Sequence, residues 1–292
     1  MELSVENTPF ESTTQNTSYK ISSLHSNLKK TNKYQLIQFN TDTHKSNQDD
    51  FMYRSFPKNI NFEKTPCSFS LGELINNQVS NSIIVKEYLH GRFDIFSLKN
   101  SITEPTAQMI RVSDRIIEAL KHISLNTIIE MICKEDIEES ASDHVPFIYN
   151  LEDPLFAELT LLKTGPLDYE TLGKLLPGCN ADDPSSMYKY GEVCSKILAL
   201  LDLVWIYKDG KTKVMLSPMG ISFKKQTLLE RCILFKKLIF RLEIIRNIYR
   251  TNPNAEVAVI AEISKWVNDS TIKRRCQSVN ILLKEINEEN PR

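Results

Sequence analysis

The sequence predicts a mainly α-helical protein that carries one small β-hairpin. Beyond residue 66, apolar residues recur at helical spacing, and polar turn residues divide these stretches into short helices. The pair Asp209-Gly210 lies between two short segments rich in β-branched and aromatic residues, which is typical of a tight hairpin turn. Together these patterns favour small helical units with one hairpin over a large sheet.

Residues 1–65 differ in composition from the rest of the chain. They are rich in Asn, Ser, Thr and Gln and contain only isolated hydrophobic residues. Such a segment buries too little apolar surface to offset the entropy lost on ordering, so we expect a disordered N-terminal arm. Within it, the alternating stretch 34–39 could pair as a strand only beside a partner.

Residues 66–150 are expected to form a small α or α+β region. Apolar residues at 82–89 fit either a strand or the start of a buried helix, and periodicity does not separate the two. One helix is expected at 106–122, and a second at 126–139 that begins at the capping residue Asn126.

Residues 151–221 follow the order of a winged helix-turn-helix domain. The expected elements are helices at 154–163, at 169–176 with Asp168 as its cap, and from Ser185 or Ser186 to about residue 201, then strands at 204–207 and 212–216. Three helices followed by a hairpin is the order that defines a helix-turn-helix with a wing.

Residues 222–292 predict a second helix-turn-helix. A long amphipathic helix is expected at 222–250, followed by helices at 255–267 and 270–286. Few residues remain after the last helix, so the second wing is expected to be truncated or missing. The predicted architecture is therefore a mainly α, tandem winged helix-turn-helix protein, preceded by a small region and a disordered arm.

Basic residues concentrate near the C-terminus, although the formal net charge of the whole chain is −1. Residues 1–150 hold 15 Lys and Arg against 19 Asp and Glu, whereas residues 205–284 hold 16 against 6, a local net charge of +10. An excess of this kind in a helical unit is the expected signature of a phosphate-binding surface. We therefore expect double-stranded DNA as the partner.

Candidate DNA contacts follow from the two helix-turn-helix units. In the first unit, the start of the third helix should meet base edges, and the lysines around the hairpin turn should meet phosphates. In the second unit, hydroxyl and basic side chains open the last helix, where arginine can bind guanine with two hydrogen bonds. The predicted DNA-binding residues are Ser186, Tyr188, Lys189, Lys208, Lys211, Lys213, Ser270, Thr271, Lys273, Arg274, Arg275 and Ser278, with Thr271, Arg274, Arg275 and Ser278 favoured as the base-reading set.

Five stretches of the C-terminal half carry a resemblance to a known family. They are MYKY at 187–190, LLDLVW at 200–205, LSPMG at 216–220, Glu230-Arg231, and STIKRRCQSV at 270–279. Over residues 150–286 the chain resembles a tandem winged-helix region of uncharacterised function found in bacterial restriction-modification proteins, including type II restriction endonucleases. The resemblance implies DNA recognition in a prokaryotic restriction-modification or defence context, with a homodimer or a restriction-modification protein as a further partner.

The chain departs from the pattern of that family at three points. The third helix of the first unit lacks the leading arginine of the family, Asp202 stands in place of a glycine, and Leu282 or Leu283 replaces a tryptophan. The helix that begins at Ser270 is therefore expected to specify the sequence, while the hairpin lysines hold phosphate. The hairpin and the long helix also show a weaker resemblance to the domain appended to some ABC-transporter ATPases. That resemblance implies a regulatory role instead.

No complete catalytic site is expected. A nuclease of the PD-(D/E)xK class needs an acidic residue and an acid-x-lysine on adjacent strands to hold Mg²⁺, and no convincing strand carries that pattern. The six cysteines form no metal-binding pair, so no cofactor or metal is expected. Two alternatives stay open: a divergent type II restriction endonuclease with a Mg²⁺-dependent nuclease at 60–145, and a winged-helix protein-interaction module.

The sequence also predicts a cytoplasmic protein without a membrane partner. Its first residues have neither a basic segment nor an apolar core of the kind found in secretory signals. No apolar run approaches the roughly 18 residues that a membrane-spanning helix requires.

Overall fold

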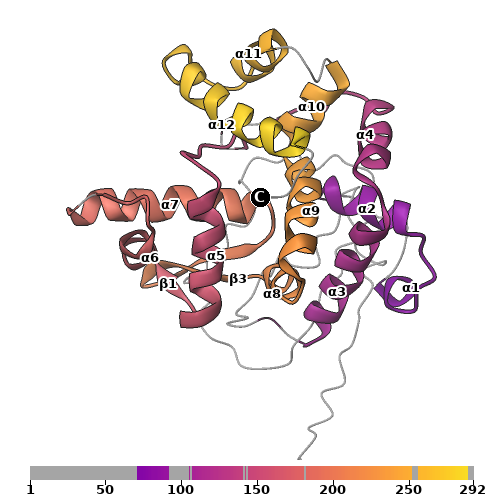
Figure 1. Cartoon of the computed structure of the whole chain (residues 1–292), viewed down its shortest axis with the longest axis horizontal. Helices are drawn as coiled ribbons and strands as arrows, with labels where there is room; N and C mark the ends of the chain where they lie inside the picture. Colours follow the sequence, from indigo (N-terminus) through magenta and orange to yellow (C-terminus); the bar gives the residue numbers. More distant parts are fainter. Residues whose placement is uncertain are drawn as a thin grey trace, which may run out of the picture.

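The computed structural model describes residues 71–91, 105, 107–140, 142, 144–180, 182–251 and 256–288. These residues form a mainly helical molecule with one three-stranded antiparallel sheet, so the predicted fold class is confirmed at that level (Figure 1). The expected arm at 1–65, with its stretch 34–39, lies outside the described residues.

The N-terminal helices resolve the choice left open at 82–89. They are α1 (Leu71–Ile75), α2 (Asn81–Leu89), α3 (Ala107–His122) and α4 (Leu125–Cys133). Residues 82–89 are thus helical. The Ser124 hydroxyl accepts a hydrogen bond from the Thr127 N–H at 3.0 Å, so Ser124, rather than Asn126, caps α4. The helix ends at Cys133, earlier than predicted, and residues 134–140 continue without helical structure.

The middle of the chain contains all three described strands. Its elements are α5 (Glu152–Thr164), β1 (Leu167–Asp168), α6 (Tyr169–Leu175), α7 (Pro184–Leu200), β2 (Val204–Asp209) and β3 (Lys211–Leu216). We call residues 152–216 the hairpin unit. Its strand order is β1-β3-β2, with Leu167 opposite Val214 and Val204 opposite Leu216.

Aspartate side chains cap the N-terminal ends of α6 and α7 in the hairpin unit. Asp168 caps α6, as predicted, by accepting the Thr171 N–H at 2.9 Å. The cap of α7 is Asp183, which accepts the Ser186 N–H at 2.9 Å, so the prediction of Ser185 or Ser186 is wrong by two to three residues. Pro184 is the first residue of α7, a position that suits proline because the N–H groups of the first helical turn have no partner within the helix.

Two glycines let α6 and α7 cross in close contact. A Cβ atom on Gly173 would lie 1.9 Å from the Met187 carbonyl oxygen, and one on Gly191 would lie 2.0 Å from the Tyr169 carbonyl oxygen. Any larger residue would therefore force the two helix backbones apart. Close packing of α6 against α7 therefore depends on both glycines.

The prediction of one long helix at 222–250 is wrong, because the helix is interrupted twice. It consists of α8 (Pro218–Lys224), α9 (Leu228–Leu238), a 3₁₀ turn (Ile239–Arg241) and α10 (Glu243–Thr251). At the first break, Thr227 and Glu230 form a reciprocal capping box that starts α9. At the second, Leu242 is extended, and the Arg246 guanidinium bonds the carbonyl oxygens of Phe240 and Arg241 at 2.7 and 2.8 Å.

The last two helices are α11 (Glu256–Ser264) and α12 (Asp269–Asn287). They correspond to the helices predicted at 255–267 and 270–286, whereas the predicted first helix of the second unit is divided as described above. No strand follows α12 within the described part of the chain, which ends at residue 288.

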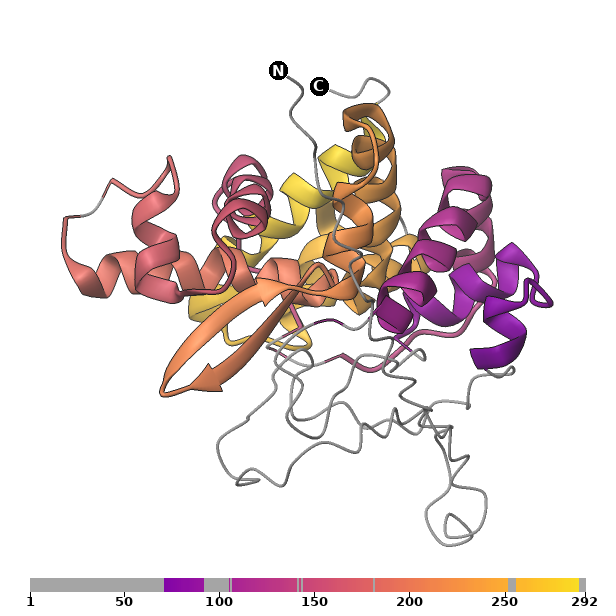
Figure 2. The ribbon, with the colours of Figure 1, turned by 90° about the horizontal axis from the view of Figure 1, so that it is seen from below.

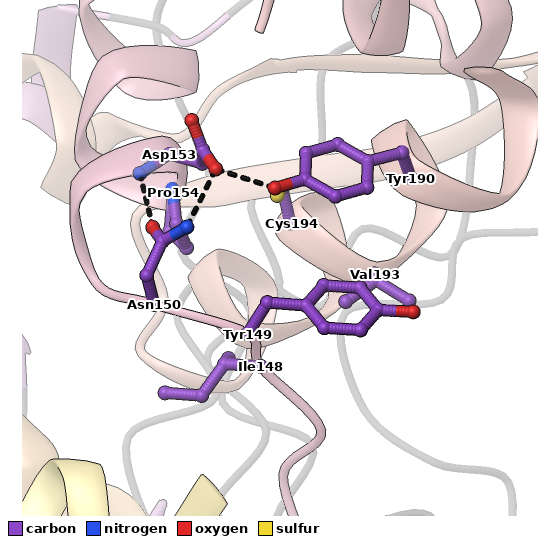
Figure 3. Close-up of a pocket in the computed structure, with 8 residues that line it drawn as sticks. All are labelled: Ile148, Tyr149, Asn150, Asp153, Pro154, Tyr190, Val193 and Cys194. Atoms are coloured by element: carbon purple, nitrogen blue, oxygen red, sulfur yellow. Dashed lines mark hydrogen bonds between the residues drawn. The ribbon is translucent and has the colours of Figure 1, made fainter. Parts of the chain in front are cut away.

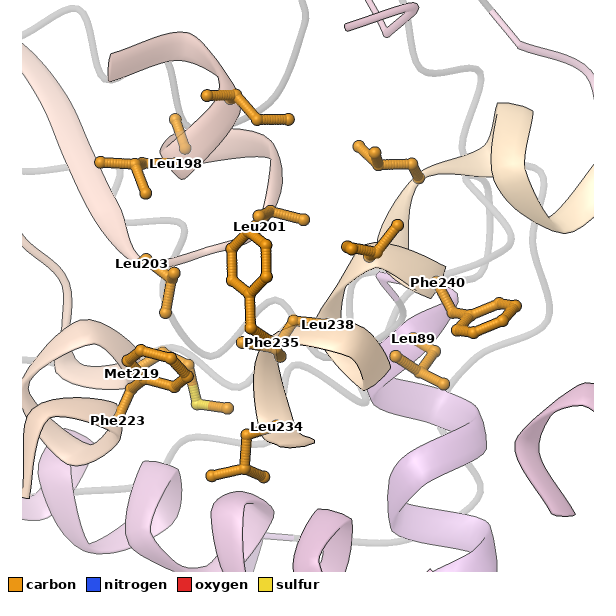
Figure 4. Packing of buried hydrophobic residues seen from close by; sticks show 14 of the residues in the cluster. Leu89, Leu198, Leu201, Leu203, Met219, Phe223, Leu234, Phe235, Leu238 and Phe240 are labelled. Carbon is orange, nitrogen blue, oxygen red and sulfur yellow. The ribbon is translucent and has the colours of Figure 1, made fainter. Parts of the chain in front are cut away.

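One continuous hydrophobic core joins the hairpin unit to the other helices. It extends from Leu74 to Ile286. Figure 4 shows α9 between two neighbours, with Phe235 facing Leu201 of the hairpin unit and Leu89 of α2 lying near Phe240. Burial of these side chains holds the parts together, since apolar surface removed from water stabilises by about 25 cal/mol per Å².

Asp202 lies in the turn between α7 and β2. Its φ is +63°, in the left-handed region that glycine adopts without steric cost and aspartate tolerates better than most residues. Its carboxylate is buried and accepts a hydrogen bond from the Tyr88 hydroxyl at 3.3 Å, with the Arg241 guanidinium 3.9 Å away. The Asp202 side chain thus links the hairpin unit to α2.

No helix among the described residues combines the length and apolar character needed to cross a membrane.

Candidate nucleic-acid interface

The start of α7 presents the predicted residues of the hairpin unit to solvent. Ser186 and Lys189 are exposed, and Lys189 forms an ion pair with Glu192 at 2.7 Å. Tyr188 is 43% exposed, although its ring packs edge-on against that of Tyr169 at 5.2 Å between centroids. Polar and aromatic groups are therefore available along the first two turns of the helix.

The hairpin projects from the body of the molecule (Figure 2). Lys208 and Lys211 are exposed on either side of its turn, where Gly210 adopts a φ of +64°. Lys213 is partly buried and pairs with Asp209 at 2.7 Å, which raises the pKa of this lysine. Two lysines at the tip are thus better placed than Lys213 to contact an anion.

Much of the basic excess at 205–284 lies inside the molecule. Lys236, Lys237, Arg241 and Arg246 are buried, and the side chains of Lys224 and Arg250 are only 5% and 3% exposed. Lys237, for example, donates to the Leu120 carbonyl at 2.6 Å, and burial lowers its pKa. Only part of the local charge of +10 therefore lies at the surface, and the exposed cations are fewer than the sequence suggests.

The start of α12 is only partly available to a ligand. Ser270, Lys273 and Arg274 are exposed. Thr271 is half-buried, and its hydroxyl donates to the Asn268 carbonyl at 2.9 Å. The Arg274 guanidinium carbon lies 4.6 Å from the centroid of the Phe147 ring, a cation–π contact.

Ser278 and Arg275 contact the protein itself, which conflicts with their prediction as base-reading residues. Ser278 is fully buried, and its hydroxyl accepts the Ile148 N–H at 3.0 Å and lies 3.1 Å from the Ile148 carbonyl oxygen. Arg275 is half-buried and donates to the Val145 carbonyl at 2.7 Å. Both side chains hold residues 145–150, which we call the strap.

The strap connects α12 to the hairpin unit (Figure 3). The Tyr149 ring stacks on that of Tyr190 of α7, with centroids 5.5 Å apart and planes 5° from parallel. The Tyr190 hydroxyl donates to Asp153 at 2.5 Å, and the Asn150 side chain donates to the same carboxylate at 2.7 Å. Burial alone would raise the pKa of Asp153, but these bonds and one from the Gly178 N–H lower it.

A buried ionic network that the sequence analysis missed joins α2 and the 134–140 segment to α10. Glu138 receives two hydrogen bonds from Arg246, at 2.9 and 2.8 Å, and one from Arg250 at 3.0 Å. Glu135 contacts His90 at 2.5 Å and Arg250 at 2.7 Å. Burial would raise the pKa of Glu135, but the bonds from His90, Lys86 and Arg250 lower it to about 2.

The same network contains a candidate set of metal ligands. One ligand atom each from His90, Glu135 and Glu138 lie within 4.8 Å of one another. Arginine side chains already bond both carboxylates, so their negative charge is compensated by the protein. We therefore interpret the cluster as an ion-pair network that stabilises the fold.

The described residues of the proposed nuclease region at 60–145 are helices and irregular segments. An acid-x-lysine motif on paired strands has no counterpart among them. The structure thus gives the nuclease alternative no specific support.

Comparison with protein-family models, with curated proteins and with solved structures finds no match to this chain. The evidence for the candidate interface is therefore its geometry.

One feature of the sequence could have indicated the ionic network. The apolar stretch FRLEIIRNIYR at 240–250 contains charged residues, and a charge inside an apolar helix face requires a partner.

Proposed function

We propose that this chain binds double-stranded DNA through the hairpin unit, with α7 in the major groove and the hairpin against the phosphate backbone. The observation that carries the proposal is the element order α5-β1-α6-α7-β2-β3 with its β1-β3-β2 sheet, which is the topology expected of a winged helix-turn-helix. The second helix of such a unit crosses the third at close range, as α6 and α7 do at their glycines.

Exposure of the start of α7 supports base contacts there. Ser186 can donate to or accept from base edges, Tyr188 offers a ring and a hydroxyl, and Lys189 can exchange its pairing with Glu192 for a phosphate. The projecting lysines Lys208 and Lys211 suit the backbone, since phosphate contacts position a protein without reading sequence.

The second unit has a smaller role in this proposal than its sequence suggests. Lys273 and Arg274 can reach phosphate, whereas Arg275 and Ser278 fix the strap that links α12 to α7. The proposed interface therefore comprises Ser186, Tyr188, Lys189, Lys208, Lys211, Lys273 and Arg274, with Lys213, Ser270 and Thr271 at its margins. A restriction-modification setting, and a homodimer or partner protein within it, are hypotheses that rest on the resemblance.

The test is duplex binding measured by fluorescence anisotropy over a series of salt concentrations. Affinity should fall as salt rises, because bound lysines release counterions from the DNA. The double substitution Lys208→Gln with Lys211→Gln should weaken binding and reduce the slope of log affinity against log salt by about 1.8, at roughly 0.9 per lost phosphate contact. Lys284→Gln, an exposed lysine near the end of α12, is the matched control.

Absence of duplex binding, or binding that does not respond to salt, would contradict the proposal. A stable complex with a protein partner under those conditions would instead favour the interaction-module alternative. Incubation of the same protein with Mg²⁺ and DNA tests the endonuclease alternative, which requires discrete cleavage fragments.

A further inference from the structure

A continuous ladder of flat groups runs from α12 across the strap to α7. The Arg274 guanidinium lies over Phe147 at 4.6 Å, the Phe147 and Tyr149 ring centroids are 4.9 Å apart, and Tyr149 stacks on Tyr190 at 5.5 Å. The Arg275 guanidinium is also near Phe147, at 5.5 Å. Each step is within the range of aromatic and cation–π attraction.

Tyr149 is the exposed aromatic ring of this ladder. It is 55% exposed, whereas Trp205, Tyr88 and Phe223 of the core are exposed by 1% or less. Figure 3 shows its ring beside that of Tyr190 at the edge of a shallow hollow between the strap and α7. A large aromatic surface is therefore presented to solvent next to the exposed Arg274.

Anchoring of the strap does not require the Tyr149 ring. Backbone groups of the strap are already held by Ser278 and Arg275, and the Asn150 side chain is bonded to Asp153. A half-exposed ring adds little buried area to these contacts. The exposed part of the ring is therefore available to a ligand that stacks.

The chemistry of the ladder fits an unpaired nucleobase. Bases stack on aromatic rings and on guanidinium planes irrespective of their identity, and neighbouring cations attract the attached phosphates. A fully paired duplex hides its base faces in its own stack, so only a single-stranded, bulged or extruded base can use such a surface. Arg274 provides a cation at the end of the ladder, over Phe147.

We infer that Tyr149, supported by Phe147, Tyr190 and Arg274, forms a stacking platform for an unpaired base of the bound DNA. The inference rests on the proposed DNA binding and adds a preference for a distorted or unpaired site. The paired DNA is held by α7 and the hairpin, while one base leaves the duplex and lies on the platform.

The experiment compares a fully paired duplex with the same duplex carrying a single unpaired 2-aminopurine. The full chain should bind the bulged duplex about 10-fold more tightly, and stacking should quench the 2-aminopurine fluorescence. Tyr149→Ala should abolish both the preference and the quenching while leaving affinity for the paired duplex unchanged. Tyr149→Phe, which keeps the ring, should retain both.

The outcomes separate this inference from the proposed function. Equal affinity of the unsubstituted chain for the two duplexes, without quenching, overturns the platform but leaves paired-duplex binding intact. A preference that survives Tyr149→Ala also overturns it. If that variant does not fold, Arg274→Gln serves instead, since it removes one end of the ladder and should reduce the preference. Failure to bind either duplex overturns both proposals.

Discussion

The hairpin unit and the C-terminal helices α10–α12 both fit a helix-turn-helix pattern in the sequence, but their polar residues serve different purposes. In the hairpin unit, Lys208, Lys211 and the start of α7 face solvent. In α10–α12, Arg246 and Ser278 are buried and bond other parts of the chain. A basic or hydroxyl-rich helix is therefore evidence for a binding surface only where its side chains are not needed inside the molecule.

The largest expected effect on stability comes from substitution of Arg246, a buried arginine of α10. Arg246→Met removes two of the three hydrogen bonds that arginines donate to the largely buried Glu138, and it also removes the donors to Phe240 and Arg241. We expect a loss of about 3 kcal/mol in the free energy of unfolding, because the Glu138 carboxylate then keeps only Arg250 as an arginine partner. Urea denaturation measures it. Arg274→Met, on the exposed side of α12, is the control and should cost far less; similar losses for both would refute the distinction.

The second largest effect is the acid sensitivity of the ionic network that holds α10. The pKa of Glu135 is about 2 in the folded protein against 4.5 for the ordinary side chain, so its contribution to stability is complete above pH 4.5. That contribution is lost as pH falls from 4.5 towards 2, because the unfolded chain then binds the extra proton. Unfolding free energies measured from pH 6 down to pH 3 should fall in the unsubstituted chain. Glu135→Gln should flatten this dependence, and an unchanged pH profile would contradict the assignment.

Substitution of Ser278 tests whether this residue, predicted to read bases, instead stabilises the fold. Ser278→Ala leaves the Ile148 N–H and carbonyl of the strap without their partner, and should cost about 1–3 kcal/mol in unfolding free energy. The exposed Ser270 of the same helix provides the matched control, since Ser270→Ala should change stability by about 0.5 kcal/mol or less. Equal effects in a denaturation experiment would argue against burial as the deciding difference.

The smallest stability effect is expected at the hairpin tip. Lys208→Gln with Lys211→Gln alters exposed side chains and should change the free energy of unfolding by no more than about 0.5 kcal/mol, while duplex affinity falls. Thermal unfolding and anisotropy on the same sample check the two parts. A large loss of stability would mean that these lysines support the fold.

Local patterns in the sequence located most elements correctly. Asp168 caps α6 and Asp209-Gly210 forms the hairpin turn, as predicted, because the groups involved are neighbours in the chain. The Thr227-to-Glu230 capping box is equally local. It was not predicted, because the amphipathic pattern at 222–250 favoured one continuous helix. The break at Leu242 was not local, since it depends on Arg246 turning back to the carbonyl groups of the preceding turn.

The candidate interface was predictable only in part, because exposure is a tertiary property. Lys208 and Lys211 are exposed through their position at a hairpin tip, which the sequence indicates. Nothing near Ser278 in the chain indicates that its hydroxyl bonds Ile148, which is 130 positions away. The Tyr149 platform likewise depends on a stack with Tyr190, 41 positions along the chain.

The sequence by itself determined the mainly helical character, the hairpin and the start of α6 at Asp168, because these depend on contacts over a few residues. Only the tertiary structure decided which charges remain at the surface. Glu138 and Arg246 are 108 positions apart, and their pairing exists only once α10 packs beside the 134–140 segment. Burial of a charge demands a partner from wherever the fold can provide one, so a charge count along the chain did not predict the charge of the surface.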